Sequence, residues 1–373
     1  MFHIKVIVYA ICKNEEKNVE LWYESMKEAD EIYVLDTGST DNTVSLFKKY
    51  DKVHIKKKKY KEFKFDVARN DSLNLVPEDA DICVCTDIDE RFHPGWREKI
   101  EKAWVSEKNV NRLKYTYNWS LRKDGSPGTT FWLGKIHSRK DYHWERPIHE
   151  YLVCTGKQKE IEAPGVVLDH HHDLKKSRDF YLDLLELQVR EMPDDPRASY
   201  LLGREYLVKK RFDDGIAILH KFLSLPKATW NQERAFGMRF MADCYKHKGY
   251  GQEAVMWYNL AIKETPDVRE PRYYLGKYYY EIKDYHNARR YLNQALFIKE
   301  RNDKYTNEAM PWDGSVYKML AVAEYECGYV DKALENLEEA IKYFPDDENL
   351  KRDRRAYKVK LKLLEKKANE PNK

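Results

Sequence analysis

The sequence predicts an α/β domain with a mostly parallel, Rossmann-like sheet, followed by an all-α solenoid of helical repeats. In the first half, short apolar runs alternate with amphipathic segments of about ten residues, the pattern of βαβ units. In the second half, small and large apolar residues recur at a regular interval, which predicts stacked helix pairs. With 373 residues, the chain is long enough for two such domains. We expect the α/β domain over residues 1–173, a connecting helix over 174–195, about four repeats over 196–345, and a basic capping helix and tail over 346–373.

The composition is that of a globular protein, with 42% hydrophobic and 35% charged residues. The net charge of +4 is small, so nucleic acid is not expected as the main partner. No apolar run reaches about 18 residues, so no transmembrane helix is expected. The apolar N-terminus lacks a basic leader and is interpreted as a first strand rather than a signal sequence. The 6 cysteines show no CxxC spacing, which favours reduced thiols in a cytoplasmic protein over disulfides or a zinc site.

The elements of the first half follow one another as strands and helices in alternation. A continuous apolar run such as Val6–Ile11 predicts a strand that is buried on both faces, and helical spacing predicts the segments between strands. The expected strands are Val6–Ile11, Ile32–Leu35, Val53–Ile55 and Ile82–Cys85, and the expected helices are Val19–Met26, Asn42–Tyr50 and Phe65–Leu75. Polar loops follow the first, second and fourth strands, whose carboxyl ends should share one edge of the sheet. Open α/β sheets bind ligands at that edge.

One strand runs directly into a cluster of carboxylates. Asp87 and Asp89 follow the apolar run Ile82–Cys85 and are two positions apart. On an extended backbone, both side chains would point to the same side. Their mutual repulsion calls for a positive partner, and a hard divalent cation such as Mg²⁺ or Mn²⁺ would also hold substrate phosphates. The alternative is a solvated acidic turn that follows the strand.

Four segments together resemble the sequential motifs of glycosyltransferase family two. They are Ile11-Cys12-Lys13-Asn14-Glu15-Glu16, Val34-Leu35-Asp36-Thr37-Gly38-Ser39-Thr40-Asp41-Asn42-Thr43, Phe65-Asp66-Val67-Ala68-Arg69-Asn70 and Thr86-Asp87-Ile88-Asp89-Glu90. The resemblance covers about residues 4–172, and it implies the GT-A fold and a sugar-nucleotide donor. The chain departs from the pattern at Asp36-Thr37, where many members have two adjacent acids.

The resemblance implies a role for each matched residue. Asp36 would contact the nucleoside, Asn14 would line the nucleotide pocket, and Arg69 would approach the diphosphate. Asp87 and Asp89 match the DxD motif of the family; both are expected at the metal, Asp89 as the more direct ligand, and Asp87 also at the sugar nucleotide. The alternative for Asp36 is a purely structural role in the turn that follows its strand. The alternative for Arg69 is a surface position on its helix.

The segment Trp144–Leu152 resembles the family's stretch that ends in His-Glu, in the acceptor half of the site. Inverting transfer needs a general base to deprotonate the acceptor. The candidates are Glu150, His149 and Glu145, and we favour the pair His149 and Glu150. The alternative is a His-Glu pair with a structural role at the end of a strand.

Three consecutive histidines, His170, His171 and His172, follow the apolar run Val166–Leu168. The resemblance implies that a late histidine adds a contact to the metal or the diphosphate, and His170 and His172 are the candidate metal ligands. The sequence leaves open which of the three makes this contact. A zinc site built from this run alone is not expected, because neighbouring strand residues alternate faces.

The second half matches the tetratricopeptide pattern, in which small residues lie where two helices cross and large ones fill the gaps. Ala254 and Ala288 are 34 positions apart, whereas Ala288 and Ala333 are 45 apart, which predicts an insertion near residues 301–312. The marker positions of the successive units are Leu202-Gly203, Tyr206 and Leu219; Met241-Ala242, Tyr245 and Tyr258; Leu275-Gly276, Tyr279 and Leu292; and Leu320-Ala321, Ala333 and Leu337.

Together these features predict a metal-dependent, inverting hexosyltransferase that uses a nucleotide diphosphate sugar, with a UDP-sugar expected as donor. The arrangement resembles bacterial peptide and protein glycosyltransferases, including S-glycosylating bacteriocin enzymes, so the repeats would recruit a peptide or protein acceptor or form a homodimer. The first alternative is a transferase that builds a cell-surface oligosaccharide. The second is a non-catalytic scaffold whose repeats bind a partner.

Overall fold

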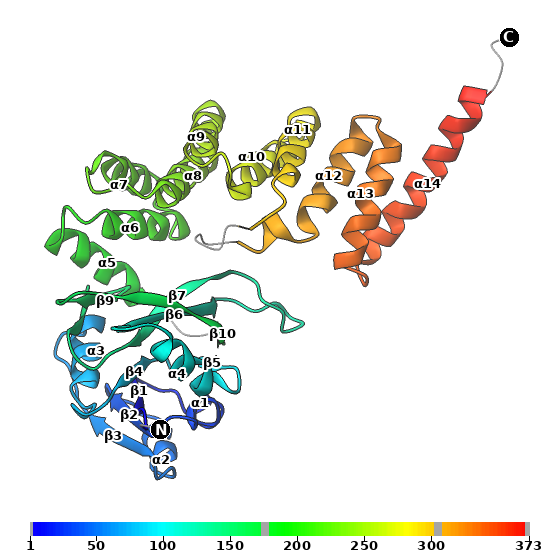
Figure 1. Cartoon of the computed structure of the whole chain (residues 1–373). Coiled ribbons are helices and arrows are strands. Elements are labelled where there is room, and N and C mark those ends of the chain that lie inside the picture. Colours follow the sequence, from blue (N-terminus) through cyan, green and yellow to red (C-terminus); the bar gives the residue numbers. More distant parts are fainter. Residues whose placement is uncertain (1–2, 173–178, 302–307, 370–373) are drawn as a thin grey trace. The chain divides into compact units, whose positions relative to one another are not determined.

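The computed structural model describes residues 3–172, 179–301 and 308–369 (Figure 1). These residues form two compact units that divide between Pro193 and Asp194. Parts of the expected connecting helix (residues 174–178), of the insertion (302–307) and of the C-terminal tail (370–373) lie outside the described residues. No helix in the described ranges has the length and apolar character needed to cross a membrane.

The first unit is built on a sheet that, within the described residues, has eight strands in the order β3-β2-β1-β4-β7-β6-β10-β5. Strands β3, β2, β1 and β4 are parallel, and β7 then pairs antiparallel with β4 and with β6. The strands are β1 (Val6–Cys12), β2 (Glu31–Asp36), β3 (Val53–Lys57), β4 (Ile82–Cys85), β5 (Glu90–Phe92), β6 (Arg112–Asn118), β7 (Thr130–His137) and β10 (Glu160–His170), and a separate pair is formed by β8 (Tyr142–Glu145) and β9 (Tyr151–Cys154). The mostly parallel sheet expected for the first half is confirmed.

The first three helices of this unit connect the parallel strands, and two more follow later in the chain. They are α1 (Val19–Met26), α2 (Thr43–Phe47), α3 (Phe65–Leu73), α4 (Trp96–Ser106) and α5 (Asp179–Glu191). Helix α2 is shorter than the expected span of residues 42–50, and α3 ends two residues before the expected position 75. Helix α5 belongs to the first unit, where Tyr181 lies beside Phe65 of α3, with ring centroids 6.2 Å apart.

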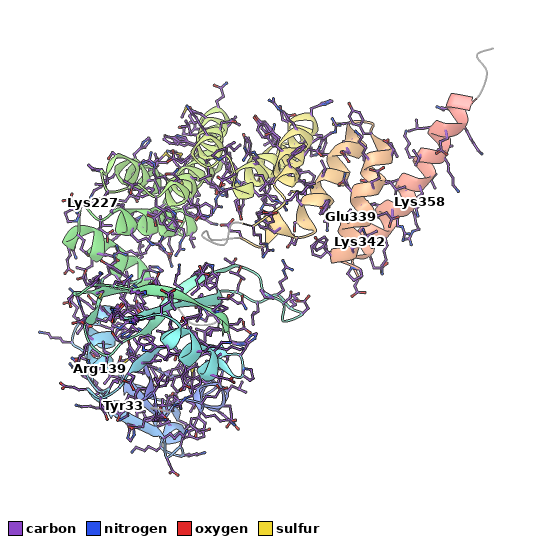
Figure 2. The ribbon with its side chains drawn as sticks, viewed as in Figure 1. Tyr33, Arg139, Lys227, Glu339, Lys342 and Lys358 are labelled. Carbon is purple, nitrogen blue, oxygen red and sulfur yellow. The ribbon has the colours of Figure 1, made fainter. Side chains whose placement is uncertain are left out.

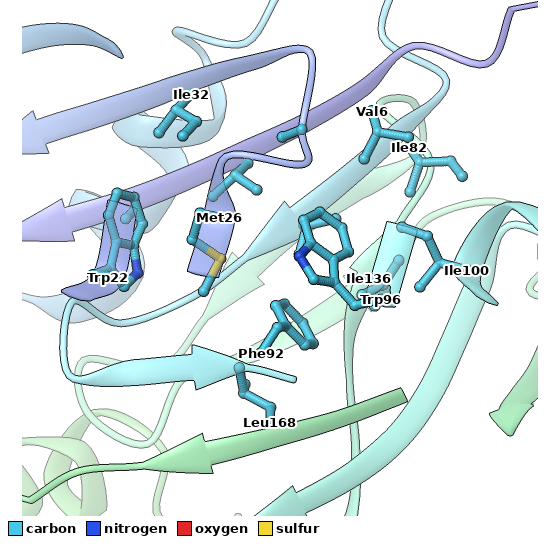
Figure 3. Packing of buried hydrophobic residues seen from close by; sticks show 14 of the residues in the cluster. Val6, Trp22, Met26, Ile32, Ile82, Phe92, Trp96, Ile100, Ile136 and Leu168 are labelled. Carbon is cyan, nitrogen blue, oxygen red and sulfur yellow. The ribbon is translucent and has the colours of Figure 1, made fainter. Parts of the chain in front are cut away.

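The main core lies between the sheet and helices α1 and α4. Every residue of β1 is buried, as expected for a strand covered on both faces. Trp22 and Met26 of α1 are four positions apart and therefore face the sheet together. Figure 3 shows these side chains and Trp96 of α4 packed over apolar residues of the strands, among them Ile82 and Ile136. Burial of this apolar surface fixes the strands whose carboxyl ends carry the candidate site.

The opposite face of the sheet contains a buried polar chain. The hydroxyl oxygen of Tyr9 on β1 lies 2.8 Å from Nε2 of His137 on β7, and Trp144 Nε1 donates to the same hydroxyl at 2.9 Å. His137 Nδ1 lies 2.7 Å from the carbonyl oxygen of Ser138, so this nitrogen carries the proton and Nε2 accepts from Tyr9. Because the imidazole is fully buried, its pKa falls to about 3.

This depressed pKa predicts that stability falls as the pH is lowered below about 6.5, the pKa of His137 in the unfolded chain. Down to about pH 3, the unfolded state binds a proton that the folded state excludes. Between pH 7.5 and 5.5, His137 alone should therefore lower the free energy of unfolding by about 1.4 kcal/mol. Urea unfolding at both pH values, with His137→Gln as the control, measures this term. Equal pH dependence in the two proteins would contradict it.

The second unit is a series of helix pairs. Among the described residues these are α6 (Pro196–Val208) with α7 (Phe212–Ser224), α8 (Asn231–His247) with α9 (Gly251–Glu264), α10 (Arg269–Glu281) with α11 (Tyr285–Phe297), and α12 (Ser315–Glu326) with α13 (Val330–Tyr343), followed by α14 (Glu348–Asn369). Gly276 marks one helix crossing: a Cβ atom there would lie 2.8 Å from Leu292 Cγ. The glycine therefore allows α10 and α11 to approach closely, as the repeat pattern requires.

The described part of the insertion packs back onto the repeats. It contains a short 3₁₀ helix, Met310–Trp312. Glu308 accepts a hydrogen bond at 2.9 Å from Arg239 of α8, and Trp312 Nε1 donates at 2.9 Å to Glu270 of α10. These bonds tie the inserted segment to earlier repeats rather than leaving it in solvent.

Candidate active site

The loops that follow β1 and β2 are joined by hydrogen bonds at the carboxyl edge of the sheet. The Asn14 side-chain oxygen accepts a hydrogen bond from the Thr40 backbone N–H at 2.8 Å, and the Asn14 backbone N–H donates to Ser39 Oγ at 2.9 Å. Asn14 has a φ of 56°, a left-handed conformation that asparagine tolerates better than most residues. The exposed Asn14 thus lies on a loop whose shape is fixed, at the edge where a ligand is expected.

Asp36 ends β2 and is almost completely buried. Its carboxylate accepts hydrogen bonds from the amides of Gly38 and Ser39, each at 3.2 Å. These bonds are those of an aspartate that organises its own turn. The geometry therefore supports the turn role, and the nucleoside contact stays a prediction.

Asp87 lies between two cations. Arg69 Nη2 forms an ion pair with it, and Lys135 Nζ lies 3.3 Å from its other oxygen. Burial alone would raise the pKa of the Asp87 carboxyl, but the charges of Arg69 and Lys135 hold it well below its usual range. The positive partner expected for the acidic pair is thus supplied to Asp87 by the protein itself.

Lys135 was missed by the sequence analysis. It lies on β7, where its ammonium group also approaches Glu90 at 3.4 Å, and its side chain is 15% exposed. Burial would lower its pKa, but the charges of Asp87 and Glu90 raise it well above the usual value. A signal was present, because this lysine interrupts the apolar-rich segment Phe131–Ile136. Its partners became visible only through the pairing of β7 with β4.

Arg69 connects the acidic cluster to a candidate base. Its side chain is 2% exposed, and Nε donates to Glu150 Oε1 at 2.9 Å. Nη1 donates to the Thr86 carbonyl at 3.3 Å, and the guanidinium lies over the Trp144 ring at 5.7 Å. Because its donors are directed at these groups inside the protein, its position does not favour the expected contact with a diphosphate. It favours a role in which Arg69 holds Asp87 and Glu150 in place.

The three candidate bases lie in different surroundings. Glu150 joins the site through Arg69. Its neighbour His149 has a φ of 52°, and its ring centroid lies 6.1 Å from that of Tyr181 on α5. Glu145 ends β8, lies 2.9 Å from His143 Nε2 on the same strand, and is 41% exposed. The structure therefore brings Glu150 to Asp87 through a shared partner.

Asp89 faces a different partner from Asp87. Its Oδ2 lies 3.3 Å from His170 Nε2 at the end of β10, and the amide of His171 donates to the Asp89 carbonyl at 2.7 Å. The extended backbone that was expected between the two acids is not found. The chain turns after β4, with the Glu90 amide donating to the Asp87 carbonyl at 3.1 Å, and the two carboxylates have different nearest partners.

The Asp89 and His170 side chains fit part of a divalent metal site. In the described ranges, no group of three or more His, Cys, Asp or Glu side chains could hold a metal ion. The facing oxygen and nitrogen are, however, 3.3 Å apart. Adjacent ligands of an octahedral Mg²⁺ are separated by about 3 Å, and such ions commonly take few protein ligands and complete their shell with phosphates and water. His172 lies beside this pair, with its ring centroid 3.7 Å from that of His170.

Comparisons with known proteins find a glycosyltransferase family model and curated glycosyltransferases similar to this chain. Residues 7–156 match the family model described as glycosyl transferase family 2. The SPbeta prophage-derived glycosyltransferase SunS of Bacillus subtilis (strain 168) is 25% identical over 245 residues, which cover 62% of this chain and 55% of that protein. The glycosyltransferase SunS of Bacillus phage SPbeta matches to the same extent. The chain thus spans about half the length of these curated relatives.

Solved structures align with the helical half. MamA covers 45% of this chain and 89% of its own, with 17% identity and a TM-score of 0.36. TTC0263, a thermophilic TPR protein in Thermus thermophilus, covers 48% and 90%, with 20% identity and a TM-score of 0.35. The repeat architecture assigned here rests on the helix pairs of the second unit. Over residues 7–156, the N-terminal unit resembles glycosyl transferase family 2.

Proposed function

We propose that the protein is a metal-dependent, inverting glycosyltransferase that moves a hexose from a nucleotide diphosphate sugar, with a UDP-sugar as donor. The observation that carries the proposal is the arrangement at the carboxyl edge of the family 2 domain. There, the pair Asp89–His170 accompanies the chain Asp87–Arg69–Glu150. The pair Asp89–His170 would supply donor atoms for a cation. The chain Asp87–Arg69–Glu150 would present the Glu150 carboxylate in a fixed position.

The proposed metal is Mn²⁺ or Mg²⁺, held by Asp89 and His170, with His172 as a neighbouring candidate. When bound there, such an ion would supply positive charge that stabilises the leaving nucleoside diphosphate. Asp87 was expected at the metal, but its pairing with Arg69 and Lys135 favours a positioning role. The exposed Asn14 loop and the turn at Asp36 would form the wall of the nucleotide pocket.

Glu150 is the proposed general base. As the acceptor attacks the anomeric carbon, its carboxylate would take the proton of the acceptor while the bond to the diphosphate breaks. Arg69 holds Glu150 at 2.9 Å, which limits the freedom of the carboxylate before reaction. His149 and Glu145 are the second choices for the base.

The proposed acceptor is a peptide or protein side chain that the repeats recruit. Stacked helix pairs form extended concave surfaces that commonly bind polypeptides. The same repeats are also a candidate surface for a homodimer.

The cysteines among the described residues are free thiols. Free thiols are typical of a reducing compartment, which supports the proposed cytoplasmic location.

A panel of nucleotide sugars, each with and without Mn²⁺, tests the proposal. We expect one uridine sugar to raise the melting temperature only with metal, and to release UDP slowly by hydrolysis. Mass spectrometry of a candidate peptide, and of an oligosaccharide acceptor, would then distinguish the two acceptor classes. No stabilisation and no hydrolysis with any donor would favour the non-catalytic scaffold.

Replacing Glu150 with glutamine should slow transfer by about 10²-fold or more, because the amide cannot accept the proton of the acceptor. Donor binding, read as thermal stabilisation by the nucleotide sugar with Mn²⁺, should change little. The isosteric amide keeps a partner for Arg69, so the fold should persist. Glu145→Gln serves as the matched control. If Glu145→Gln slows transfer and Glu150→Gln does not, Glu145 is the general base instead.

A further inference from the structure

Helix α14 packs on the repeats along its first part alone. Leu350 and Tyr357 are buried, Tyr357 stacks on Tyr325 of α12 with ring centroids 4.2 Å apart, and Arg354 donates to Glu338 of α13 at 2.8 Å. The helix then continues to Asn369, and Figure 1 shows its red end extending past α13. The second part of α14 therefore presents its side chains to solvent within this unit.

That second part exposes large apolar side chains. Val359 is 59% exposed, Leu363 is 52% exposed and Leu364 is 40% exposed. Val359 and Leu363 are four positions apart, so a helix places them on one side, and Leu364 lies about 100° further around the helix. Grouped apolar side chains at a helix end that extends beyond its neighbours indicate a surface that another body covers.

The same helix is strongly basic. Its sequence, ENLKRDRRAYKVKLKLLEKKAN, has nine Lys and Arg residues against three Asp and Glu. The basic residues near its start form ion pairs, such as Lys351 with Glu348 and Arg354 with Glu338. Lys360, Lys362, Lys366 and Lys367, which follow Tyr357, form no ion pair with any residue that the structure describes. Their charge is thus not neutralised within the described fold.

We propose that the second part of α14, residues 358–369, lies on an anionic lipid surface. An amphipathic helix with uncompensated lysines inserts its apolar side chains at the boundary between headgroups and acyl chains, while anionic headgroups attract the lysines. Lys362 and Lys366 are four positions apart and form a basic side next to Lys358, which pairs with Glu338 at 3.5 Å. Lys360 and Lys367 lie between Leu363 and Leu364 around the helix, where their long stems let the ammonium groups reach the headgroups.

The charge and the exposed apolar side chains of α14 favour a lipid surface over a second copy of the chain and over nucleic acid. A second copy of α14 would bring like charges together, because each copy carries the same basic excess. Nucleic acid would match the lysines but offers no apolar surface along its phosphate backbone for Val359 and Leu363. A surface that is both anionic and apolar beneath its headgroups satisfies both features.

Co-sedimentation of the full chain with vesicles tests the proposal without any sugar donor, so its result is independent of the proposed transferase activity. The vesicles contain phosphatidylcholine alone or with about 30 mol percent phosphatidylglycerol, which is enough to give a negative surface. We expect about fivefold more bound protein, or a larger excess, on the anionic vesicles, and a decrease when salt is raised.

Two double variants separate the apolar contribution to vesicle binding from the electrostatic one. Val359→Gln with Leu363→Gln keeps the charge and removes apolar contact, and Lys362→Gln with Lys366→Gln does the reverse; each should lower binding severalfold. The controls are Val208→Gln, at an exposed apolar site on α6, and Lys227→Gln with Lys342→Gln, at exposed lysines labelled in Figure 2. All changed side chains are exposed, and circular dichroism would confirm that each variant folds.

Three results would overturn the proposal. The first is equal binding to neutral and anionic vesicles, or none to either. The second is binding that the controls weaken as much as the α14 variants do. The third is a dimer in sedimentation velocity that Val359→Gln with Leu363→Gln abolishes, together with no vesicle binding, which would assign the surface to a second copy of the chain.

Discussion

Asp89→Ala is expected to reduce glycosyl transfer by about 10³-fold while leaving the protein folded. The Asp89 carboxylate lies 3.3 Å from His170 Nε2, and together they form the proposed protein part of the metal site. A bound divalent ion contributes several kcal/mol of charge stabilisation, and about 4 kcal/mol corresponds to a thousandfold change in rate. Initial rates with the best uridine sugar and Mn²⁺ measure this loss.

A second readout separates metal binding from a general loss of structure. Thermal stabilisation by the donor should depend on Mn²⁺ in the wild type and lose that dependence in Asp89→Ala. His170→Ala should behave in the same way if the two side chains share one ion. Asp51→Ala, which removes an exposed carboxylate elsewhere in the first unit, is the control. Full turnover by Asp89→Ala would refute the metal assignment, whatever the other variants do.

The parallel part of the sheet was predictable because its central strands β1 and β4 are short apolar runs that are buried along their whole length. Strand β1 is buried along its whole length, and the loops after β1, β2 and β4 carry the motifs at one edge. Local sequence therefore located the edge of the site. It also located the repeats, since small residues such as Gly276 are needed wherever two helices cross.

The partners of the site residues were not predictable in the same way, because they depend on contacts between distant segments. Lys135 meets Asp87 because β7 pairs antiparallel with β4, a register that no local pattern specifies. Asp87 and Asp89 meet different partners, and the chain turns after β4 instead of staying extended. Arg69 was expected to face solvent or a phosphate, and its position between two acids follows from how α3 packs on the sheet.

Arg69→Met is expected to lower the free energy of unfolding by about 3 kcal/mol. The guanidinium is 2% exposed and pairs with Asp87 and with Glu150, whose side chain is 11% exposed. Removing the cation leaves Glu150 without its charged partner in a largely buried position, and it removes one of two cations beside Asp87. Urea unfolding at pH 7.5 measures the loss. Lys64→Met, which breaks the more exposed pair with Glu191, should cost less than about 1 kcal/mol.

The cause of the loss can be tested by removing the second charge as well. If the uncompensated carboxylate is responsible, Arg69→Met combined with Glu150→Gln should recover part of the stability that Arg69→Met loses, because the amide is cheaper to bury than the charge. If the double variant is instead as unstable as the sum of the single variants, Arg69 acts through its packing on Trp144 rather than through its charge. Either result also bears on catalysis. A positioning role for Arg69 requires that the folded Arg69→Met protein, assayed well below its melting temperature, still binds the donor and yet transfers the sugar slowly.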